Sequence, residues 1–422
     1  MDFREDVELI EDDIKERKRL YRKGVRRGIA FTLFFVIVFS IAGSMFLKEN
    51  GFVITSFKMD KKLTTQILSE SVQKKAAEVL SALSAYYYDD IPEENLPDGM
   101  YAGMVSALGD KYTSYFTKEQ YEEYLSGTNG MYYGIGAILT QDKESLAITV
   151  TKVYEGSPAE KAGIKEGDLF VSADGNKADG MELSKFVNYV RGEKGSKVKL
   201  VMLRDGKEKT FTVTCDEVKV PTIEYRMLKN HVGYIRITEF DGVTAGQFKE
   251  ALKELKQKNM SSLMVDLRDN PGGMINSVTE ILDELLPKGI LVYTKDKSGK
   301  KTTYRSGRDE LGMPLAVLVN ENSASASEIF AGAVKDYKYG TLIGTKTFGK
   351  GIVQVLLPLS DGSAVKVTTA KYFTPKGHYI HEKGIAPDVK LTFEYLGDKK
   401  KDYNIYKDNQ VLKALEILKE SR

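Results

Sequence analysis

Residues 314–359 read PLAVLVNENSASASEIFAGAVKDYKYGTLIGTKTFGKGIVQVLLPL, and the organisation of the chain follows from this stretch. Leu315–Val319 is an apolar run with the length and composition of a buried strand. A turn of small residues around Ser325 comes next, and apolar residues then recur at helical spacing from Ile329 to Val334. Ser325 is therefore predicted where a strand gives way to a helix, among unpaired backbone N–H groups. A hydroxyl placed there can attack a carbonyl, and the N–H groups can hold the resulting oxyanion.

A lysine between two glycines follows the serine turn. Thr341–Gly344 predicts a second strand, Lys350 stands between glycines after it, and Gln354 lies four residues beyond the lysine. Simpler interpretations remain open on local sequence alone. Ser325 and Glu328 fit a capping box at a helix start, and a lysine between glycines is ordinarily a solvated loop charge.

Taken together, the segments at 323–329 (SASASEI) and 349–354 (GKGIVQ) resemble the carboxy-terminal processing, or tail-specific, serine peptidases of the S41 type. The resemblance extends over about residues 60–420. It implies that Ser325 is the nucleophile, that Lys350 is its general base and that Gln354 supports the lysine. It also implies a peptidase core of the crotonase/ClpP type.

The core is expected to begin near residue 220. Strands and helices alternate over 220–345, which predicts α/β units and a largely parallel sheet within a multidomain α/β (α+β) chain. The predicted strand Ser262–Leu267 leads into Gly272 and Gly273, whose backbone allows close approach by a ligand or an ordinary left-handed turn. The family resemblance implies two oxyanion donors, one from this glycine pair, with Gly273 favoured, and the other from Ala326.

Residues 131–217 have the pattern of a separate module. Their Ser-Pro-Ala, Ala-Gly-Ile and Gly-Asp segments between 156 and 168 resemble a PDZ domain, which binds chain ends by strand addition. A turn permitted by glycines is the alternative interpretation of its opening loop. The resemblance implies that a peptide C-terminus binds this loop, which consists of Tyr133, Gly134, Ile135, Gly136 and Ala137.

The N-terminal part contains a candidate membrane segment. Ile29–Leu47 carries no charge, and as a helix it would be roughly 29 Å long, enough for a bilayer core of about 30 Å. Basic residues precede it, which predicts a cytoplasmic N-terminus and a catalytic part outside the cell membrane, extracellular or periplasmic. A cleaved signal peptide stays open, since Ser40–Ser44 contains small residues that suit cleavage.

Residues 63–125 are predicted to be helical, including the run from 109 to 117. The apolar stripes of this region are expected to pack into a core, and the family resemblance implies that it shapes the cleft and can mediate homodimers. The stripe residues are Val72, Ala76, Val79, Leu80, Leu83, Met100, Met104 and Leu108.

Composition excludes several functional classes. A formal net charge of +2 gives no sign of a nucleic-acid surface. The single cysteine, Cys215, rules out an intrachain disulfide and is expected to be buried. His231, His378 and His381 lack metal-ligand spacing, although His378 and His381 remain formal candidates for a Ser-His site. No metal or other cofactor is predicted.

Catalysis by Lys350 requires a neutral amine at working pH, which burial away from carboxylates favours. No Asp or Glu lies between residues 339 and 359, which fits this requirement. In a plain strand Lys350 and Gln354 would lie roughly 13 Å apart. Direct contact therefore needs a helical turn or a bulge at Gly351.

The sequence thus predicts a membrane-anchored serine endopeptidase that captures protein C-termini and cleaves with a Ser/Lys dyad. The alternatives are a PDZ-bearing scaffold with an inactive peptidase core and acyl-CoA chemistry on the related fold. Its predicted partners are protein or peptide substrates with free C-termini, the membrane through residues 28–47, and a second copy of the chain. The predicted divisions are 1–27 (cytoplasmic leader), 28–47 (transmembrane helix), 60–127 (helical region), 131–217 (PDZ), 220–395 (peptidase core) and 396–422 (C-terminal tail and helix).

Overall fold

A computed structural model describes residues 60–421. The chain divides into two compact units, with the boundary between Pro92 and Glu93. The predicted membrane segment, Ile29–Leu47, lies outside the described residues. Within 60–421, no helix combines the length and the apolar character needed to cross a membrane.

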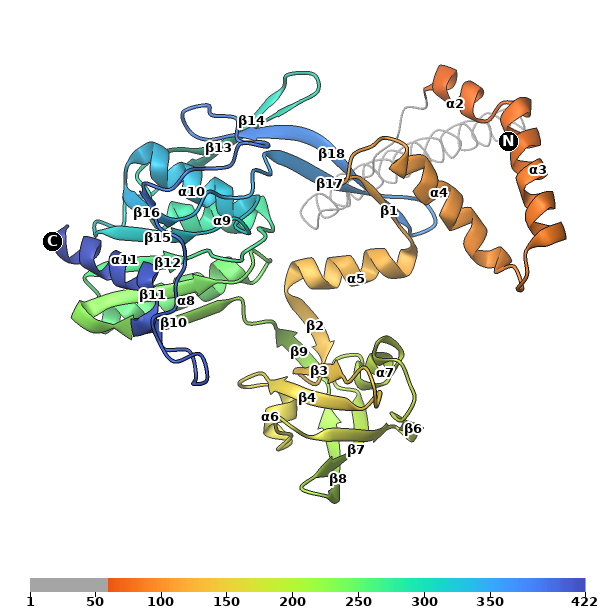
Figure 1. Cartoon of the computed structure of the whole chain (residues 1–422), viewed down its shortest axis with the longest axis horizontal. Coiled ribbons are helices and arrows are strands. Elements are labelled where there is room, and N and C mark those ends of the chain that lie inside the picture. The colour runs from red at the N-terminus through yellow and green to blue at the C-terminus, as the bar shows by residue number, and fades with distance from the viewer. Residues whose placement is uncertain (1–59, 422) are drawn as a thin grey trace, which may run out of the picture. The chain divides into compact units, whose positions relative to one another are not determined.

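The described part of the first unit consists of helices α2 (Lys61–Ile67) and α3 (Glu70–Tyr86) (Figure 1). Neither helix contains a buried residue. On α3 the Val79 side chain is 52% exposed and Leu83 is 38% exposed. The expectation that this stripe packs into a core is wrong for α3, because an apolar helix face is buried only where another element covers it.

The second unit begins with η1 (Glu93–Asn95), α4 (Leu96–Ser106), β1 (Ser114–Phe116) and α5 (Lys118–Asn129). The helical prediction is wrong between α4 and α5. There the Asp110 carboxylate accepts hydrogen bonds from the Tyr112 N–H (3.0 Å) and the Thr113 hydroxyl (2.6 Å), which shapes a turn that leads into β1. Met100, Met104 and Leu108 are also exposed rather than packed in a core.

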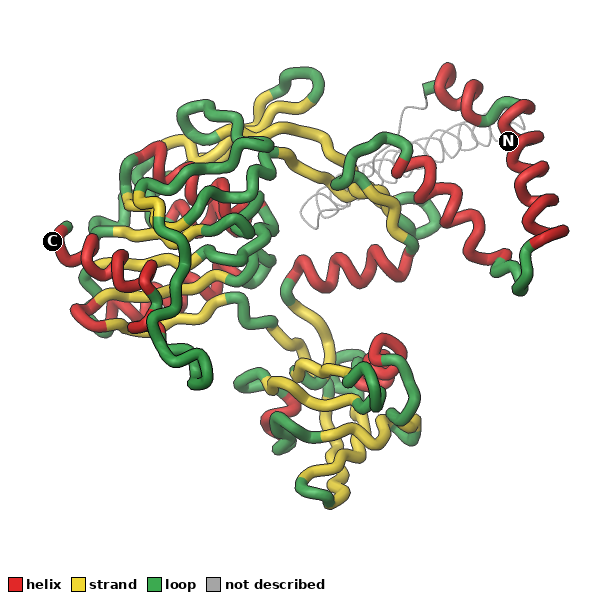
Figure 2. Tube along the Cα trace, viewed as in Figure 1, coloured by secondary structure: helices red, strands yellow, loops and turns green. Residues whose placement is uncertain are grey.

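A β-rich module follows, and two paired strands connect it to the rest of the unit (Figure 2). Its main sheet has the antiparallel order β3-β4-β5-β7-β8, with β6 beside β5, while β2 pairs with β9. Cys215 is buried in the module's core, as predicted. The elements are β2 (Met131–Gly134), β3 (Ala137–Gln141), β4 (Ile148–Val153), α6 (Pro158–Lys161), β5 (Leu169–Ala173), β6 (Asn176–Lys177), α7 (Leu183–Val190), β7 (Lys197–Arg204), β8 (Lys207–Thr214) and β9 (Asp216–Lys219).

The largest core surrounds a six-stranded sheet of order β10-β11-β12-β15-β16-β19, in which only the β10/β11 pair is antiparallel (Figure 1). The predicted, largely parallel α/β sheet is therefore confirmed. Its elements are β10 (Ile223–Leu228), η2 (Lys229–His231), β11 (Val232–Ile237), α8 (Thr244–Gln257), β12 (Ser262–Asp266), α9 (Ile275–Asp283), β15 (Leu315–Val319), α10 (Ala326–Tyr337), β16 (Gly340–Gly344) and β19 (Val389–Lys390).

Both faces of this sheet are covered, which explains why its central strands are continuously apolar. Val265 and Val317 pack in one cluster with residues of α8, α9 and α10. Met264 and Leu318, one position along each strand, pack in another cluster with residues of the C-terminal helix α11 (Asn409–Glu420). Every residue of β12 and β15 is consequently buried.

A second sheet connects the turn at residues 110–113 to the core. Its order is β1-β18-β13-β14, and β17 pairs with β18. The long strands β17 and β18 form the ribbon that runs toward β1 in Figure 1. The strands are β13 (Gly289–Asp296), β14 (Lys301–Ser306), β17 (Ile352–Pro358) and β18 (Ala364–Phe373).

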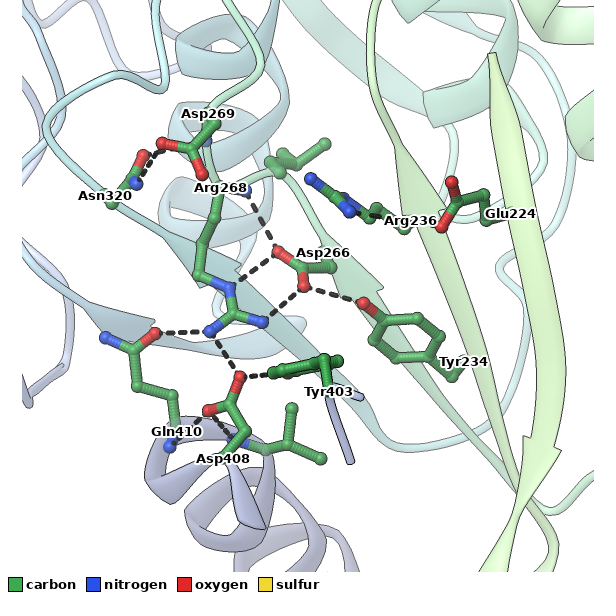
Figure 3. Close-up of polar contacts among 12 residues, drawn as sticks. Glu224, Tyr234, Arg236, Asp266, Arg268, Asp269, Asn320, Tyr403, Asp408 and Gln410 are labelled. Carbon is green, nitrogen blue, oxygen red and sulfur yellow. Dashed lines mark hydrogen bonds and ion pairs between the residues drawn. The ribbon is translucent and has the colours of Figure 1, made fainter. Parts of the chain in front are cut away.

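A largely buried arginine fixes the C-terminal segment to the end of β12 (Figure 3). The Arg268 guanidinium binds Asp266 at 2.6 Å and Asp408 at 2.7 Å. Asp408 follows η3 (Ile405–Lys407) and caps α11 by accepting the N–H groups of Gln410 and Val411. The tail is thus held beside the strand that leads into the Gly272-Gly273 turn.

Candidate active site

Ser325 occupies the turn between β15 and α10, as predicted. Its backbone has φ 53° and ψ −110°, a left-handed conformation that is costly for a residue with a Cβ. The neighbouring turn fits closely against it. A Cβ on Gly272 would lie 2.7 Å from the Ser325 Cβ and 2.7 Å from the Ala324 carbonyl oxygen, so only glycine fits there.

The two predicted oxyanion donors lie in these adjoining turns. The Gly272 N–H donates to the Asn270 side chain at 2.8 Å and is therefore occupied. Among residues 60–421, no acceptor takes a hydrogen bond from the N–H of Gly273 or Ala326. These two N–H groups therefore remain available to an oxyanion.

Glu328 joins the serine turn to the lysine loop. Its buried carboxylate accepts the N–H groups of Ser325 at 3.0 Å, Gly349 at 2.7 Å and Lys350 at 2.7 Å. It also accepts the Thr347 hydroxyl at 2.6 Å. The bond from the Ser325 N–H is the one that the capping-box interpretation predicted. The capping glutamate thus also holds the backbone of Lys350, 22 residues away in the sequence.

Lys350 lies in the loop between β16 and β17, and it is partly buried. Burial and the positive charge of Lys366 lower the pKa of its amine, while the carboxylates of Asp110 and Glu328 oppose that shift. The Lys350 Nζ also lies 4.7 Å from the centroid of the Tyr112 ring. The amine is therefore held in surroundings that favour the neutral form a general base needs.

Gln354 has a different partner from the one expected. Its side-chain N–H donates to the Thr368 hydroxyl at 3.3 Å, and no hydrogen bond in the described chain joins it to Lys350. The register of β17 against β18 shifts between Val353 and Gln354. The irregularity thus lies later than the bulge considered at Gly351.

One cavity brings the predicted catalytic groups together. It has a volume of about 620 Å³ and is lined by Ser325, Lys350 and Gln354 together with both glycines of the 272–273 turn. Glu239 and Asp241 line it as well, and burial together with the Glu239 charge raises the pKa of Asp241 to about 7. The cavity therefore combines a serine hydroxyl, an amine and the available N–H of Gly273, which is the composition expected of a serine hydrolase site.

Other candidate bases are occupied elsewhere. Lys335 binds Asp388 at 2.8 Å, and His378 lies 3.2 Å from Asp336. His381 lies closer to the lysine loop, where its Nδ1 accepts the Gly351 N–H at 3.3 Å. Within the described residues, no group of His, Cys, Asp and Glu side chains is suited to hold a metal ion.

In the β-rich module, the predicted carboxylate-binding loop joins β2 to β3. Gly136 has φ +80°, and a Cβ there would lie 2.4 Å from the Ser157 Cβ, so this turn requires glycine. The Gln141 side chain binds the Met181 carbonyl and the Leu183 N–H, which fixes the start of α7 to the end of β3. The loop therefore lies at the start of the strand that α7 contacts.

A second cavity, of about 520 Å³, is lined by residues of the Arg268 network, whose polar contacts Figure 3 shows. The Asp269 carboxylate on its wall accepts the side-chain amides of Asn320 and Asn322, each at 2.8 Å. Arg268 binds both Asp266 and Asp408. The hydroxyls of Tyr234 and Tyr403 donate to Asp266 and Asp408, and Arg268 also donates to the Gln410 side chain. This cavity contains none of the predicted catalytic residues.

Sequence reasoning missed several of these residues. On local sequence Glu328 indicates only a helix cap, and no pattern points to Asp110, Tyr112 or Lys366. The four-donor cluster around Glu328 depends on two loops that meet only in the folded chain. Tyr112 lay inside a segment interpreted as helical, so no local signal connected it with Lys350.

Comparison with known proteins identifies the family of the chain. The family model "Peptidase family S41" matches residues 231–391, and a PDZ-domain model matches 149–204. A "Probable CtpA-like serine protease" of Staphylococcus epidermidis is 37% identical over 341 residues, which cover 80% of this chain and 68% of the relative. A Staphylococcus aureus protein with the same description is 37% identical over 326 residues, 76% of this chain and 65% of that protein.

A solved structure, the photosystem II D1 C-terminal processing protease, is 32% identical and covers 71% of this chain and 82% of its own, with a TM-score of 0.43. The relatives establish the class, a serine peptidase that carries a PDZ domain. The chain belongs to peptidase family S41, as its motifs indicated.

Proposed function

We propose that this chain is a membrane-anchored endopeptidase that captures protein C-termini through its PDZ domain and cleaves peptide bonds with Ser325 and Lys350. The observation that carries the proposal is the cavity that both residues line together with the available N–H of Gly273. The hydrogen bonds of Glu328 to both loops support the same pairing.

In this mechanism the Ser325 oxygen attacks the scissile carbonyl carbon and its proton passes to the neutral Lys350 amine. The N–H groups of Gly273 and Ala326 stabilise the oxyanion. The C–N bond then breaks, and Lys350 returns the proton to the leaving amine. Water then attacks the acyl carbon while Lys350 takes its proton. The ester C–O bond breaks, and Lys350 returns the proton to the Ser325 oxygen. Gln354 acts on the lysine indirectly, through Thr368 and β18.

The test is cleavage of an unstructured protein with an apolar C-terminus by the purified chain. Ser325→Ala and Lys350→Ala are expected to abolish cleavage, whereas Lys346→Ala, at an exposed lysine in the same loop, should retain it. Melting temperatures close to the parent's would show that the variants are folded. Cleavage by Ser325→Ala at the parent's rate would overturn the assignment. Binding without any cleavage by the parent would favour the scaffold alternative.

Capture of the substrate end is assigned to the loop from Tyr133 to Ala137. The glycine requirement at Gly136 and the contact between α7 and β3 support it, because PDZ domains hold a terminal carboxylate on loop N–H groups at such a strand. A peptide with a free carboxylate should bind more tightly than its amidated form. Equal affinity for the two peptides would contradict this assignment.

Membrane attachment and pairing belong to the same proposal. The uncharged segment Ile29–Leu47 supports an anchor with the catalytic part outside, which protease protection of intact cells would test. The exposed apolar stripe of α3 supports a homodimer, since such a face is usually covered. Sedimentation of Leu80→Glu beside the parent would test pairing, and an unchanged mass would refute a dimer through α3.

A further inference from the structure

The turn before β1 covers the proposed general base. The ring of Tyr112 has its centroid 4.7 Å from the Lys350 Nζ. Asp110, at the start of the same turn, is one of the carboxylates whose charge acts on that amine. This segment lies outside both ranges matched by the family models, 149–204 and 231–391. Nothing in those matches assigns it a role.

Hydrogen bonds join the turn to the sheet that carries Gln354. Thr113 is buried; its hydroxyl donates to Asp110 at 2.6 Å and accepts the Thr368 N–H at 3.1 Å. The Thr368 hydroxyl accepts the Gln354 amide at 3.3 Å. Beyond it, β1 pairs with β18 from Ser114 to Phe116. One set of contacts therefore fixes the ring of Tyr112 and the partner of Gln354 together.

The same segment also faces Lys366, the other lysine of the cavity. The Lys366 Nζ lies 5.2 Å from the ring centroids of Phe116 and of Tyr124. Tyr124, Gly127 and Thr128 line the cavity itself. Residues of α5 therefore form part of the cavity wall, although α5 precedes the matched peptidase region.

We propose that Tyr112 is a positioning residue for the general base, and that its ring shields the Lys350 amine from water while the Asp110–Thr113 turn fixes the ring in place. This inference rests on the proposed role of Lys350 as the base.

Two effects of the ring oppose each other. Its face attracts an ammonium ion, which favours the charged lysine. Its bulk excludes water, which favours the neutral lysine. Water solvates an ammonium ion better than a ring face does, so removal of the ring should increase the charged fraction of Lys350. The acidic limb of the pH–rate profile should then move to higher pH.

The experiment compares the full chain with Tyr112→Leu, Tyr112→Phe and a control, Tyr88→Leu, at an exposed tyrosine. For Tyr112→Leu we expect roughly a tenfold lower kcat/KM at pH 7 that recovers toward the parent value as the pH rises, since one pH unit is tenfold in the neutral fraction. Tyr112→Phe keeps the ring and should keep the profile, as should Tyr88→Leu. A pH-independent loss, or no loss, would overturn the proposal.

A second measurement does not depend on activity. Trace acetylation of Lys350, quantified by mass spectrometry against pH in a Ser325→Ala background, reports the neutral fraction of its amine. Tyr112→Leu should move this titration to higher pH, and an unmoved titration would refute the shielding role. If Tyr112→Leu does not fold, Thr113→Val loosens the turn and should shift the titration in the same direction. Full activity of Lys350→Ala would instead refute the Ser325/Lys350 dyad. A failure of the dyad can therefore be told apart from a failure of the shielding role of Tyr112.

Discussion

The Glu328→Gln substitution tests how the serine turn and the lysine loop are held together. One carboxylate oxygen accepts the N–H groups of Ser325 and Lys350, and the other accepts the Gly349 N–H and the Thr347 hydroxyl. An amide offers only one oxygen. Whichever way it is turned, its NH₂ group faces at least one backbone N–H, which then loses its acceptor.

The size of the effect follows from that geometry. A buried N–H left without an acceptor costs about 1–3 kcal/mol, and hydrogen bonds to a charged group are worth about 1.5–3 kcal/mol each. If the cost falls on the active arrangement of the two loops, kcat/KM should fall roughly 5-fold to 160-fold. If it falls on the whole fold, the free energy of unfolding should drop by the same 1–3 kcal/mol.

Both quantities are measurable on the same preparations, kcat/KM by peptide cleavage and stability by urea unfolding. Glu321→Gln is the matched control, because Glu321 is exposed and its carboxylate accepts the Thr345 hydroxyl. It should change either quantity little. Parent-like activity together with parent-like stability in Glu328→Gln would refute the reasoning, since a buried N–H cannot lose its acceptor without cost.

Three further predictions concern charges around the core. Lys366→Met removes a positive charge that lowers the pKa of Lys350, so the acidic limb of kcat/KM should move to higher pH; an unmoved limb would contradict the coupling. Arg268→Met leaves Asp266 and Asp408 buried without their cation, so it should lower the free energy of unfolding by about 3–5 kcal/mol. Hydrogen exchange in α11 should also become faster, and an unchanged exchange rate would argue against the anchoring role of Arg268. Burial raises the pKa of Asp241 to about 7, so the folded chain binds its proton more tightly and stability is lost as pH rises from about 4 to about 7. Asp241→Asn should remove that part of the pH dependence, and an unchanged urea midpoint profile from pH 5 to pH 8 would refute it.

Periodicity and turn residues were sufficient to predict much of the fold. The apolar run at Leu315–Val319 is buried throughout because helices cover both faces of its sheet. The helix after Ser325 was predictable because residues at 3.6-residue spacing share one face. Such patterns are local, and they fail where contacts with residues distant in the sequence determine the secondary structure. Residues 110–116 were predicted to be helical, but Asp110 shapes a turn there and β18 supplies the strand partner.

The sequence by itself determined the motif pair around Ser325 and Lys350, the family, and the order of the modules, because these depend on residue identity and spacing. The tertiary structure decided what surrounds the lysine. No acidic residue lies near Lys350 in the sequence, yet Asp110 and Glu328 act on its amine in the folded chain. Burial and charge interactions depend on which atoms lie close together in space. The energy between two charges falls with the distance between the atoms, whatever their separation along the chain.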